Sequence, residues 1–211
     1  VCRPSDMPEM CRMLALTFAQ NDPPAVAVGL TPAEFEVFVR LVAAPETTRQ
    51  LTLVARDPAS GALAGAMLTE DAASAAPDGM ADLSPKFDPI FGLFGLLDAQ
   101  LPDQPAPPPG EVLHLFLLGV DDRYAGLGVA QRLLRETLDR GIATGYRTAV
   151  VEATNRTSQH IFSKLGFAAR ARTSHAAYRH DGIQVFASVA DHGGPWSMRR
   201  DLRTDRDGDA R

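Results

Sequence analysis

The sequence predicts an α/β (α+β) domain whose mixed central sheet has about seven strands, with an antiparallel first half and helices on both faces. Three stretches of the chain carry this prediction. Residues 111–167 read as strand, glycine turn, helix, strand and short helix. Residues 50–56 and 62–69 are predicted to form an antiparallel hairpin around Pro58 to Gly61, and residues 167–179 and 183–190 a closing hairpin through His180-Asp181-Gly182.

The stretch 111–167 organises the rest of the chain. Residues 112–120 are an apolar run of strand length, and a polar corner at 121–124 leads into the glycine turn 125–130. In the helix that follows, apolar residues recur at three- and four-residue spacing, so one face is buried and the first turn is fixed in space. These apolar residues are Val129, Leu133, Leu134, Leu138 and Ile142.

The glycine turn at the start of this helix predicts an anion site, most simply for a pyrophosphate. A helix start offers unpaired backbone N–H groups, and glycines let a ligand approach the backbone closely. A P-loop is excluded because the turn lacks Gly-Lys-Ser/Thr. A dinucleotide fold is disfavoured because Gln131 occupies the place of its third glycine, although Glu152 imitates the acid that binds ribose.

The turn resembles motif A of the GNAT acyl-CoA N-acyltransferases, in which a strand runs into V-D-x-x-Y-(Q/R)-x-x-G-x-(G/A). Five positions match that pattern, and Ala125 replaces the usual Gln or Arg. The loss removes one polar neighbour of the phosphates but leaves the backbone cradle. The matching residues are Val120, Asp121, Tyr124, Gly128 and Ala130.

Residues 155–167 resemble motif B of the same superfamily, with Asn155, Ser158, Lys164 and the closing Leu-Gly-Phe in their expected places. The resemblance covers about a third of the chain and implies a GNAT fold that binds acetyl-CoA. The strand before the glycine turn is then expected to splay and to present backbone groups to the pantetheine arm. The residues implied in acetyl-CoA binding are Leu118, Gly119, Val120, Ala125, Gly126, Leu127, Gly128, Val129, Ala130, Asn155, Ser158 and Phe162.

The chain of 211 residues is expected to form one domain over residues 1–202, with a disordered tail at 203–211. Val1–Pro4 is predicted as the end of a first strand. Ser5 is predicted to cap the first helix, and Thr31 with Glu34 a second one. An Ala/Pro-rich insertion at 72–110 contains one amphipathic helix. Its apolar face is expected to pack in a core or a dimer contact, or to cover the acceptor pocket as similar insertions in arylalkylamine-type relatives do.

The composition argues against some classes of binding partner. A net charge of −5 without a basic cluster argues against nucleic acid and acidic membranes, and no apolar run is long enough to span a bilayer. Cys2 and Cys11, without a hydrophobic leader, favour a cytoplasmic location and a structural role for both thiols. No metal is expected. A homodimer is left open.

Asp22 is one candidate for the general base, since an alkylamine of pKa about 10 must lose a proton before it attacks a thioester. Phe18-Ala-Gln-Asn-Asp22-Pro23 is similar to the Phe-x-x-(Asp)-Glu-Pro segment of insect-type arylalkylamine acetyltransferases, whose glutamate is the base. Thr154 and Ser158 match two hydroxyl residues that accompany that glutamate. The alternatives are a turn-forming aspartate before proline, a hydroxyl at a strand end and a serine on a helix face.

His114 is the other candidate. It stands where vertebrate arylalkylamine acetyltransferases carry the first of two relay histidines, but the second position is Phe116. The alternative is a hydrogen-bonded core histidine. Phe162 replaces the tyrosine that many GNATs use as general acid, which leaves a thiolate of pKa about 8.5 to depart unaided, or Ser158 or Tyr178 to substitute.

The sequence therefore predicts an N-acetyltransferase that moves the acetyl group of acetyl-CoA to a primary amine of a small molecule, with an arylalkylamine as one candidate. Two alternatives stay open. One is a non-catalytic acyl-CoA-binding or regulatory protein, which the residues Phe116, Ala125 and Phe162 would suit. The other is a protein N-terminal acetyltransferase, which would need an open peptide groove near residues 72–110.

Overall fold

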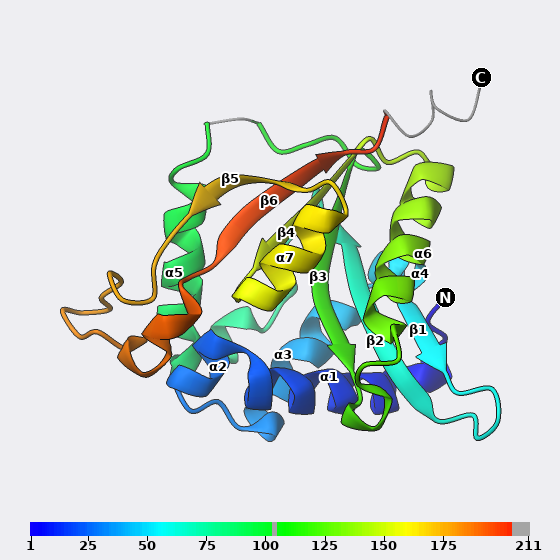
Figure 1. The fold of residues 1–211 in the computed structure, drawn as a ribbon, viewed down its shortest axis with the longest axis horizontal. Coiled ribbons are helices and arrows are strands. Elements are labelled where there is room, and N and C mark those ends of the chain that lie inside the picture. Colours follow the sequence, from blue (N-terminus) through cyan, green and yellow to red (C-terminus); the bar gives the residue numbers. More distant parts are fainter. Residues whose placement is uncertain (103–104, 204–211) are drawn as a thin grey trace.

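The computed structural model describes residues 1–102 and 105–203, and in them six strands form one mixed sheet (Figure 1). The strand order is β1-β2-β3-β4-β6-β5, and all neighbours are antiparallel except β3 and β4. The strands are β1 (Leu53–Arg56), β2 (Leu63–Asp71), β3 (Val112–Val120), β4 (Thr148–Ala153), β5 (Ala168–Arg172) and β6 (Trp196–Asp201). The predicted mixed α/β sheet with an antiparallel first half is confirmed.

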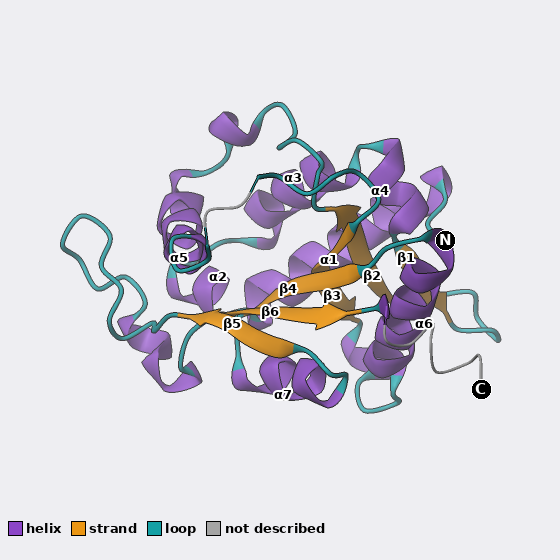
Figure 2. Ribbon diagram, turned by 90° about the horizontal axis from the view of Figure 1, so that it is seen from above, coloured by secondary structure: helices purple, strands orange, loops and turns teal. Residues whose placement is uncertain are grey.

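Helices cover both faces of the sheet (Figure 2). On one face, α1, α3 and α5 enclose a core rich in phenylalanine and methionine. On the other, α6 and α7 pack over a core of leucine, valine and aromatic residues. The α-helices are α1 (Met7–Asn21), α2 (Pro23–Ala27), α3 (Pro32–Ala43), α4 (Glu46–Leu51), α5 (Asp88–Asp98), α6 (Val129–Thr144) and α7 (Arg156–Lys164). Short 3-10 helices span Pro4–Asp6, Met80–Asp82, Pro85–Phe87, Asp122–Tyr124 and Ala187–His192.

Strands β3 and β4 diverge halfway along. Their parallel pairing joins Val112–His114 to Thr148–Val150, and the described pairs stop there. β3 continues to Val120 along β2, whereas β4 continues to Ala153 along β6. The splay expected from the GNAT resemblance is therefore present, and it begins at His114.

A bulge in β3 lies inside the splay. Leu68 of β2 pairs with Leu117 and Thr69 pairs with Leu115, so Phe116 is the extra residue on β3. A bulge bends its strand and redirects side chains. Leu115 accordingly belongs to the core beneath α6, whereas Leu117 belongs to the core beneath α1.

Some predicted elements need correction. Residues 1–4 form no strand, and the cap of α1 is Asp6 rather than Ser5. Residues 183–190 form no strand either: Phe186 and Val189 are three residues apart and buried, and a 3-10 helix spans Ala187–His192. The last strand is instead β6, which lies between β4 and β5. The predicted tail, apart from Arg203, lies outside the described residues.

The predicted cap of α3 is confirmed, because Thr31 and Glu34 form a capping box. The Glu34 carboxylate also forms an ion pair with Lys86 Nζ at 2.9 Å, and Lys86 belongs to the segment that precedes α5. Lys86 Nζ donates a second hydrogen bond, to the carbonyl of Gly29, at 2.8 Å. The insertion is thus anchored to the start of α3.

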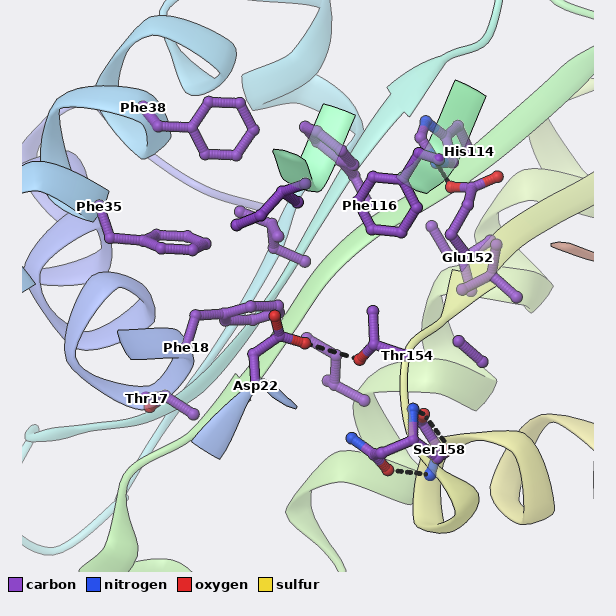
Figure 3. Close-up of a pocket in the computed structure, with 18 of the residues that line it drawn as sticks. Thr17, Phe18, Asp22, Phe35, Phe38, His114, Phe116, Glu152, Thr154 and Ser158 are labelled. Atoms are coloured by element: carbon purple, nitrogen blue, oxygen red, sulfur yellow. Dashed lines mark hydrogen bonds and ion pairs between the residues drawn. The ribbon is translucent and has the colours of Figure 1, made fainter. Parts of the chain in front are cut away.

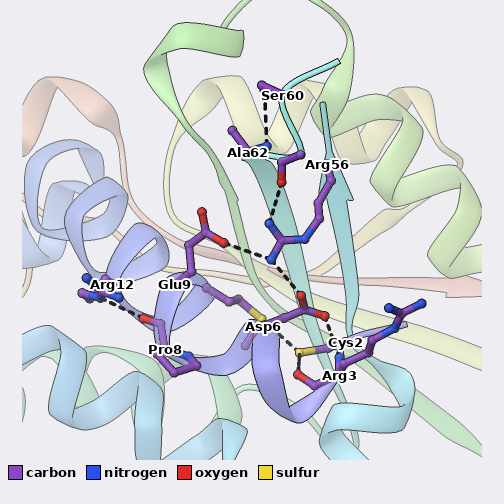
Figure 4. A network of polar contacts seen from close by, with 11 residues as sticks. Cys2, Arg3, Asp6, Pro8, Glu9, Arg12, Arg56, Ser60 and Ala62 are labelled. Atoms are coloured by element: carbon purple, nitrogen blue, oxygen red, sulfur yellow. Dashed lines mark hydrogen bonds and ion pairs between the residues drawn. The ribbon is translucent and has the colours of Figure 1, made fainter. Parts of the chain in front are cut away.

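Arg56 joins the edge strand β1 to the start of α1 (Figure 4). Its guanidinium contacts Asp6 Oδ1 at 2.7 Å and Glu9 Oε2 at 2.9 Å, and it donates to the carbonyl of Gly61 at 2.8 Å. Burial opposes ionisation of Asp6, but hydrogen bonds from the Arg3 amide and Arg56 outweigh it and lower its pKa. This network fixes α1 beneath the first two strands.

Candidate functional site

One cavity of about 500 Å³ crosses the sheet at the splay of β3 and β4. Its lining includes residues from the cores on both faces of the sheet. Phenylalanines supply much of the wall on the α3 and α5 side. They are Phe18, Phe35, Phe38, Phe87, Phe91, Phe94 and Phe116.

The insertion contributes one wall of this cavity. The amphipathic helix predicted within 72–110 is α5, and Ile90, Phe91, Phe94 and Asp98 line the cavity. Phe91 stacks on Phe87 with ring centroids 5.6 Å apart. The apolar face of α5 therefore packs partly in the core and partly over the cavity.

Asp22 lies at the mouth of the splay, where α1 ends and α2 begins (Figure 3). Its Oδ1 accepts a hydrogen bond from Thr154 Oγ1 at 2.6 Å, and its Oδ2 accepts one from the Ala25 amide at 3.3 Å. Burial raises the pKa of this carboxyl to about 6, against the two hydrogen bonds, which lower it. Asp22 therefore caps α2 and also lines the cavity with a carboxyl group whose pKa is close to neutral pH.

Ser158 lies one helical turn inside α7 and takes part in its capping box. The Ser158 amide donates to Asn155 Oδ1 at 2.9 Å, and Ser158 Oγ donates to the Asn155 carbonyl at 2.9 Å. Both residues also line the cavity. Of the two hydroxyl residues, Thr154 donates to Asp22, whereas the Ser158 hydroxyl donates to the Asn155 carbonyl at the start of α7.

His114 is held between two carboxylates. Its Nδ1 lies 2.9 Å from Glu70 Oε1, and its Nε2 lies 2.7 Å from Glu152 Oε2. Burial alone would lower the imidazole pKa, but the two carboxylates raise it to about 10. Burial likewise opposes the charge on Glu152, and His114 overcomes this and lowers the pKa of Glu152. At neutral pH the group is an imidazolium flanked by two carboxylates.

This geometry separates the two candidate bases. An imidazolium that already holds its proton cannot take another from an amine, so His114 does not have the protonation state of a general base. Asp22 has a pKa near the working pH and a carboxylate on the cavity. The arrangement favours Asp22 for proton transfer and a positioning role for His114.

The glycine turn has the geometry of an anion cradle. Gly126 and Gly128 have φ of 76° and 75°, and the turn exposes Leu127. A Cβ on Gly126 would meet nothing within 4 Å, and one on Gly128 would meet only Gln131 Oε1, at 3.8 Å. The hydrogen bond from the Arg132 amide to the Gly128 carbonyl belongs to the first turn of α6. The amides of Val129 and Ala130 come before Arg132 in the chain, at the helix start where backbone N–H groups lack helical partners.

The remaining residues implied in cofactor binding divide into two sets, because Leu118 and Phe162 line the cavity, whereas Gly119, Val120 and Ala125 are not among its lining residues. Phe162 packs edge-on against Phe167 at 5.2 Å. Gly119 has its missing side chain toward α1, since a Cβ there would lie 2.8 Å from Leu14 Cδ2. Val120 ends β3 opposite Gly65, and Ala125 is exposed just before the glycines. Tyr178 does not line the cavity and lies 3.4 Å from His180 Nδ1.

Sequence reasoning missed several residues of the site. Glu70 and Glu152 were not assigned as partners of His114, although both are carboxylates on strands predicted beside it. Gly65 was also missed: a Cβ there would lie 3.0 Å from the Gly119 carbonyl and 3.1 Å from Val129 Cγ1. The start of α6 can approach the sheet because that side chain is absent.

Over residues 1–102 and 105–203, no group of three or more His, Cys, Asp or Glu side chains could hold a metal ion. None of the helices in those ranges combines the length and apolar character needed to cross a membrane. Cys2 and Cys11 are both buried and unbridged.

Comparison with known proteins gives two findings. Residues 79–167 match the family model described as the acetyltransferase (GNAT) family. The fold is similar to that of arylalkylamine N-acetyltransferase 2 from Aedes aegypti, with a TM-score of 0.78 and 19% identity over 95% of this chain and 96% of that one.

Two further structures share the fold. The C-terminal condensation domain of Ebony, in complex with β-alanyl-dopamine, gives a TM-score of 0.80 and 15% identity over 94% of this chain and 95% of that one. The polyamine N-acetyltransferase of Drosophila melanogaster catalyses formation of N-acetylagmatine. It gives a TM-score of 0.68 and 18% identity over 93% of this chain and 95% of that one. Residues 79–167 therefore match the acetyltransferase (GNAT) family, and the chain as a whole has the GNAT fold that arylalkylamine N-acetyltransferases share.

Proposed function

We propose that this protein transfers the acetyl group of acetyl-CoA to the primary amine of a small molecule, with arylalkylamines among the acceptors. The observation that carries the proposal is the cavity that crosses the sheet at the splay. It brings the Asp22–Thr154 pair to the same space as the diverging edge of β3. Donor and acceptor can thus approach from opposite faces and meet there.

Asp22 acts as the general base in this proposal. The Asp22 carboxylate takes a proton from the substrate ammonium, and the freed amine nitrogen attacks the thioester carbonyl and forms a C–N bond. The nitrogen then gives up its second proton to solvent. The C–S bond then breaks, and CoA leaves as the thiolate, whose pKa of about 8.5 lets it depart without a dedicated acid. The hydrogen bond from Thr154 holds the Asp22 carboxylate toward the cavity.

The binding of acetyl-CoA is proposed to use the backbone. The amides of residues 126–130 lie at the start of a long, packed helix, where a pyrophosphate is stabilised. The open space at Gly126 and Gly128 fits close approach by a phosphate. The edge of β3 at Leu118–Val120 would hold the pantetheine arm and polarise the carbonyl, as in an oxyanion hole.

The acceptor is proposed to be small. Proteins of the same fold carry the names arylalkylamine, polyamine and agmatine N-acetyltransferase. The phenylalanine wall suits an aryl or alkyl group, and the nearby carboxylates suit a cation. A protein N-terminal acetyltransferase would need an open peptide groove, but α5 lines the cavity at that place.

The test is release of free CoA from acetyl-CoA in the presence of a panel of aryl, alkyl and polyamine acceptors, with acetylated product measured by mass. Turnover with at least one primary amine, lost in Asp22→Asn, supports the proposal. Binding of acetyl-CoA without transfer to any amine would favour the non-catalytic alternative.

A further inference from the structure

The three strands that meet at the splay each contribute one polar side chain to a single row. Glu70 of β2 pairs directly with His114 of β3, and His114 pairs with Val150 of β4. Glu152 follows two residues later on β4, and successive side chains alternate across a strand, so it shares the face of Val150. The imidazole lies between the two carboxylates at 2.9 Å and 2.7 Å.

This Glu70–His114–Glu152 row carries net negative charge beside an apolar wall. One imidazolium faces two carboxylates, and Asp98 of α5 adds a third carboxylate to the cavity lining. The ring of Phe116 lies 4.9 Å from that of His114. His114 contacts one oxygen of Glu152, and a carboxylate has about four acceptor positions. Glu152 can therefore accept a further donor from inside the cavity.

The spacing to the reacting end follows from the strand. Thr154, which contacts Asp22, stands two residues after Glu152, and both side chains are half-buried and line the cavity. A strand rises about 3.3 Å per residue, so the Cα atoms of Glu152 and Thr154 are about 7 Å apart. Phenyl rings line the same cavity, and the ring of Phe116 lies 4.9 Å from that of His114, the partner of Glu152.

We propose that Glu152, held in place by His114, is a specificity-determining residue that receives a second hydrogen-bond donor of the acceptor amine. The preferred acceptor is a short primary amine with an apolar middle and a hydroxyl or second ammonium about 7 Å from the reacting nitrogen, matched to the strand spacing. His114 is a positioning residue, because its imidazolium fixes the carboxylate without taking the substrate proton. This inference rests on the proposed function and names the chemistry of its acceptor.

The experiment compares acceptors in matched pairs that differ only by the distal donor: phenethylamine with tyramine, and pentylamine with 1,5-diaminopentane. In the wild-type protein, at least one donor-bearing member should exceed its partner in kcat/KM by about tenfold or more, the worth of a hydrogen bond to a charged group. Glu152→Leu should abolish that preference, so that the two members of each pair have kcat/KM values within about threefold of each other. The matched control is Glu136→Gln, an exposed glutamate of α6.

Glu152→Gln separates the two kinds of donor. It keeps an acceptor oxygen but removes the charge, so a hydroxyl preference should survive and an ammonium preference should fall. Equal kcat/KM within both pairs of the wild-type protein would overturn the inference while leaving acetyl transfer established. Absence of transfer to all four amines and to the wider amine panel would overturn the proposed function instead. The wild-type comparison decides the point even where a variant does not fold.

Discussion

Thr154 Oγ1 donates a hydrogen bond to Asp22 Oδ1 at 2.6 Å, although 132 residues separate the two in the chain. Asp22 stands between α1 and α2, and Thr154 stands where β4 has left β3. The contact therefore joins the first helices to the second half of the sheet at the cavity wall. It also couples the protonation of Asp22 to a single hydroxyl.

Asp22→Asn should lower kcat by about a hundredfold or more, since proton transfer by a placed group is worth that much. The amide keeps the size of the carboxyl and can still accept from Thr154, but it cannot take the proton. Affinity for acetyl-CoA, measured by calorimetry, should stay within about twofold because Asp22 is not in the cradle at residues 126–130. His114→Phe serves as the comparison, and the larger loss of kcat identifies the base.

The pH profile of kcat/KM should follow the same carboxyl. Burial raises the pKa of Asp22 to about 6, and the base is active when deprotonated, so the rate should rise with pH through about 6. The stability of the folded state changes with pH in the opposite direction to the rate. The folded state holds the proton more tightly than the unfolded one, so stability associated with Asp22 is lost as pH rises through that value. Full activity at pH 5 would contradict the assignment.

Thr154→Val should move this acid limb to higher pH. The hydroxyl stabilises the charged carboxylate and lowers its pKa, so its removal leaves burial less opposed. Valine keeps the shape of threonine and removes the donor. Thr154→Ser, which keeps the hydroxyl, is the matched control and should retain the wild-type limb. An unchanged profile in the valine variant would show that the hydrogen bond does not tune the base.

The ion pairs of His114 predict a pH-dependent contribution to stability. The folded pKa is about 10, above the unfolded value of 6.5, so the stabilisation is complete below 6.5 and is lost as pH rises through 10. The free energy of unfolding of His114→Gln, measured by chemical denaturation, should thus fall furthest below wild type near pH 6 and approach it near pH 10. His160→Gln, at an exposed position of α7, is the control. A gap that is constant with pH would mean a neutral imidazole.

The sequence predicted the elements whose signals are local. The strand, glycine turn, helix, strand and capped helix of residues 112–164 are all present, because apolar period, glycines and caps act within a few residues of each other. β6 was missed because Trp196–Asp201 has only two buried residues, Ser197 and Met198, and its pairing partners lie far away in the chain.

The candidate site divides in the same way. The glycine turn and Asp22 before Pro23 were visible as motifs. The aromatic wall was not, because Phe35 and Phe38 have the spacing of ordinary core residues on a helix. The pairing of His114 with Glu70 and Glu152 depends on which strands are neighbours and in which register, and both follow from the folded sheet.

Gly128→Val should weaken acetyl-CoA binding by at least about tenfold, or about 1.4 kcal/mol. Gly128 has φ of 75° at the start of α6, and a Cβ there would meet only Gln131 Oε1, at 3.8 Å, so a branched side chain would occupy the proposed approach of the pyrophosphate. The substitution also strains the backbone, because side chains other than glycine avoid this conformation. Gly145→Val supplies the matched control: Gly145 ends the same helix with φ of 108°, with nothing within 4 Å of a Cβ. Both variants should lose stability in thermal melts, but only Gly128→Val should lose affinity in calorimetry. Equal affinities in the two folded variants would remove the glycine turn from the acetyl-CoA site.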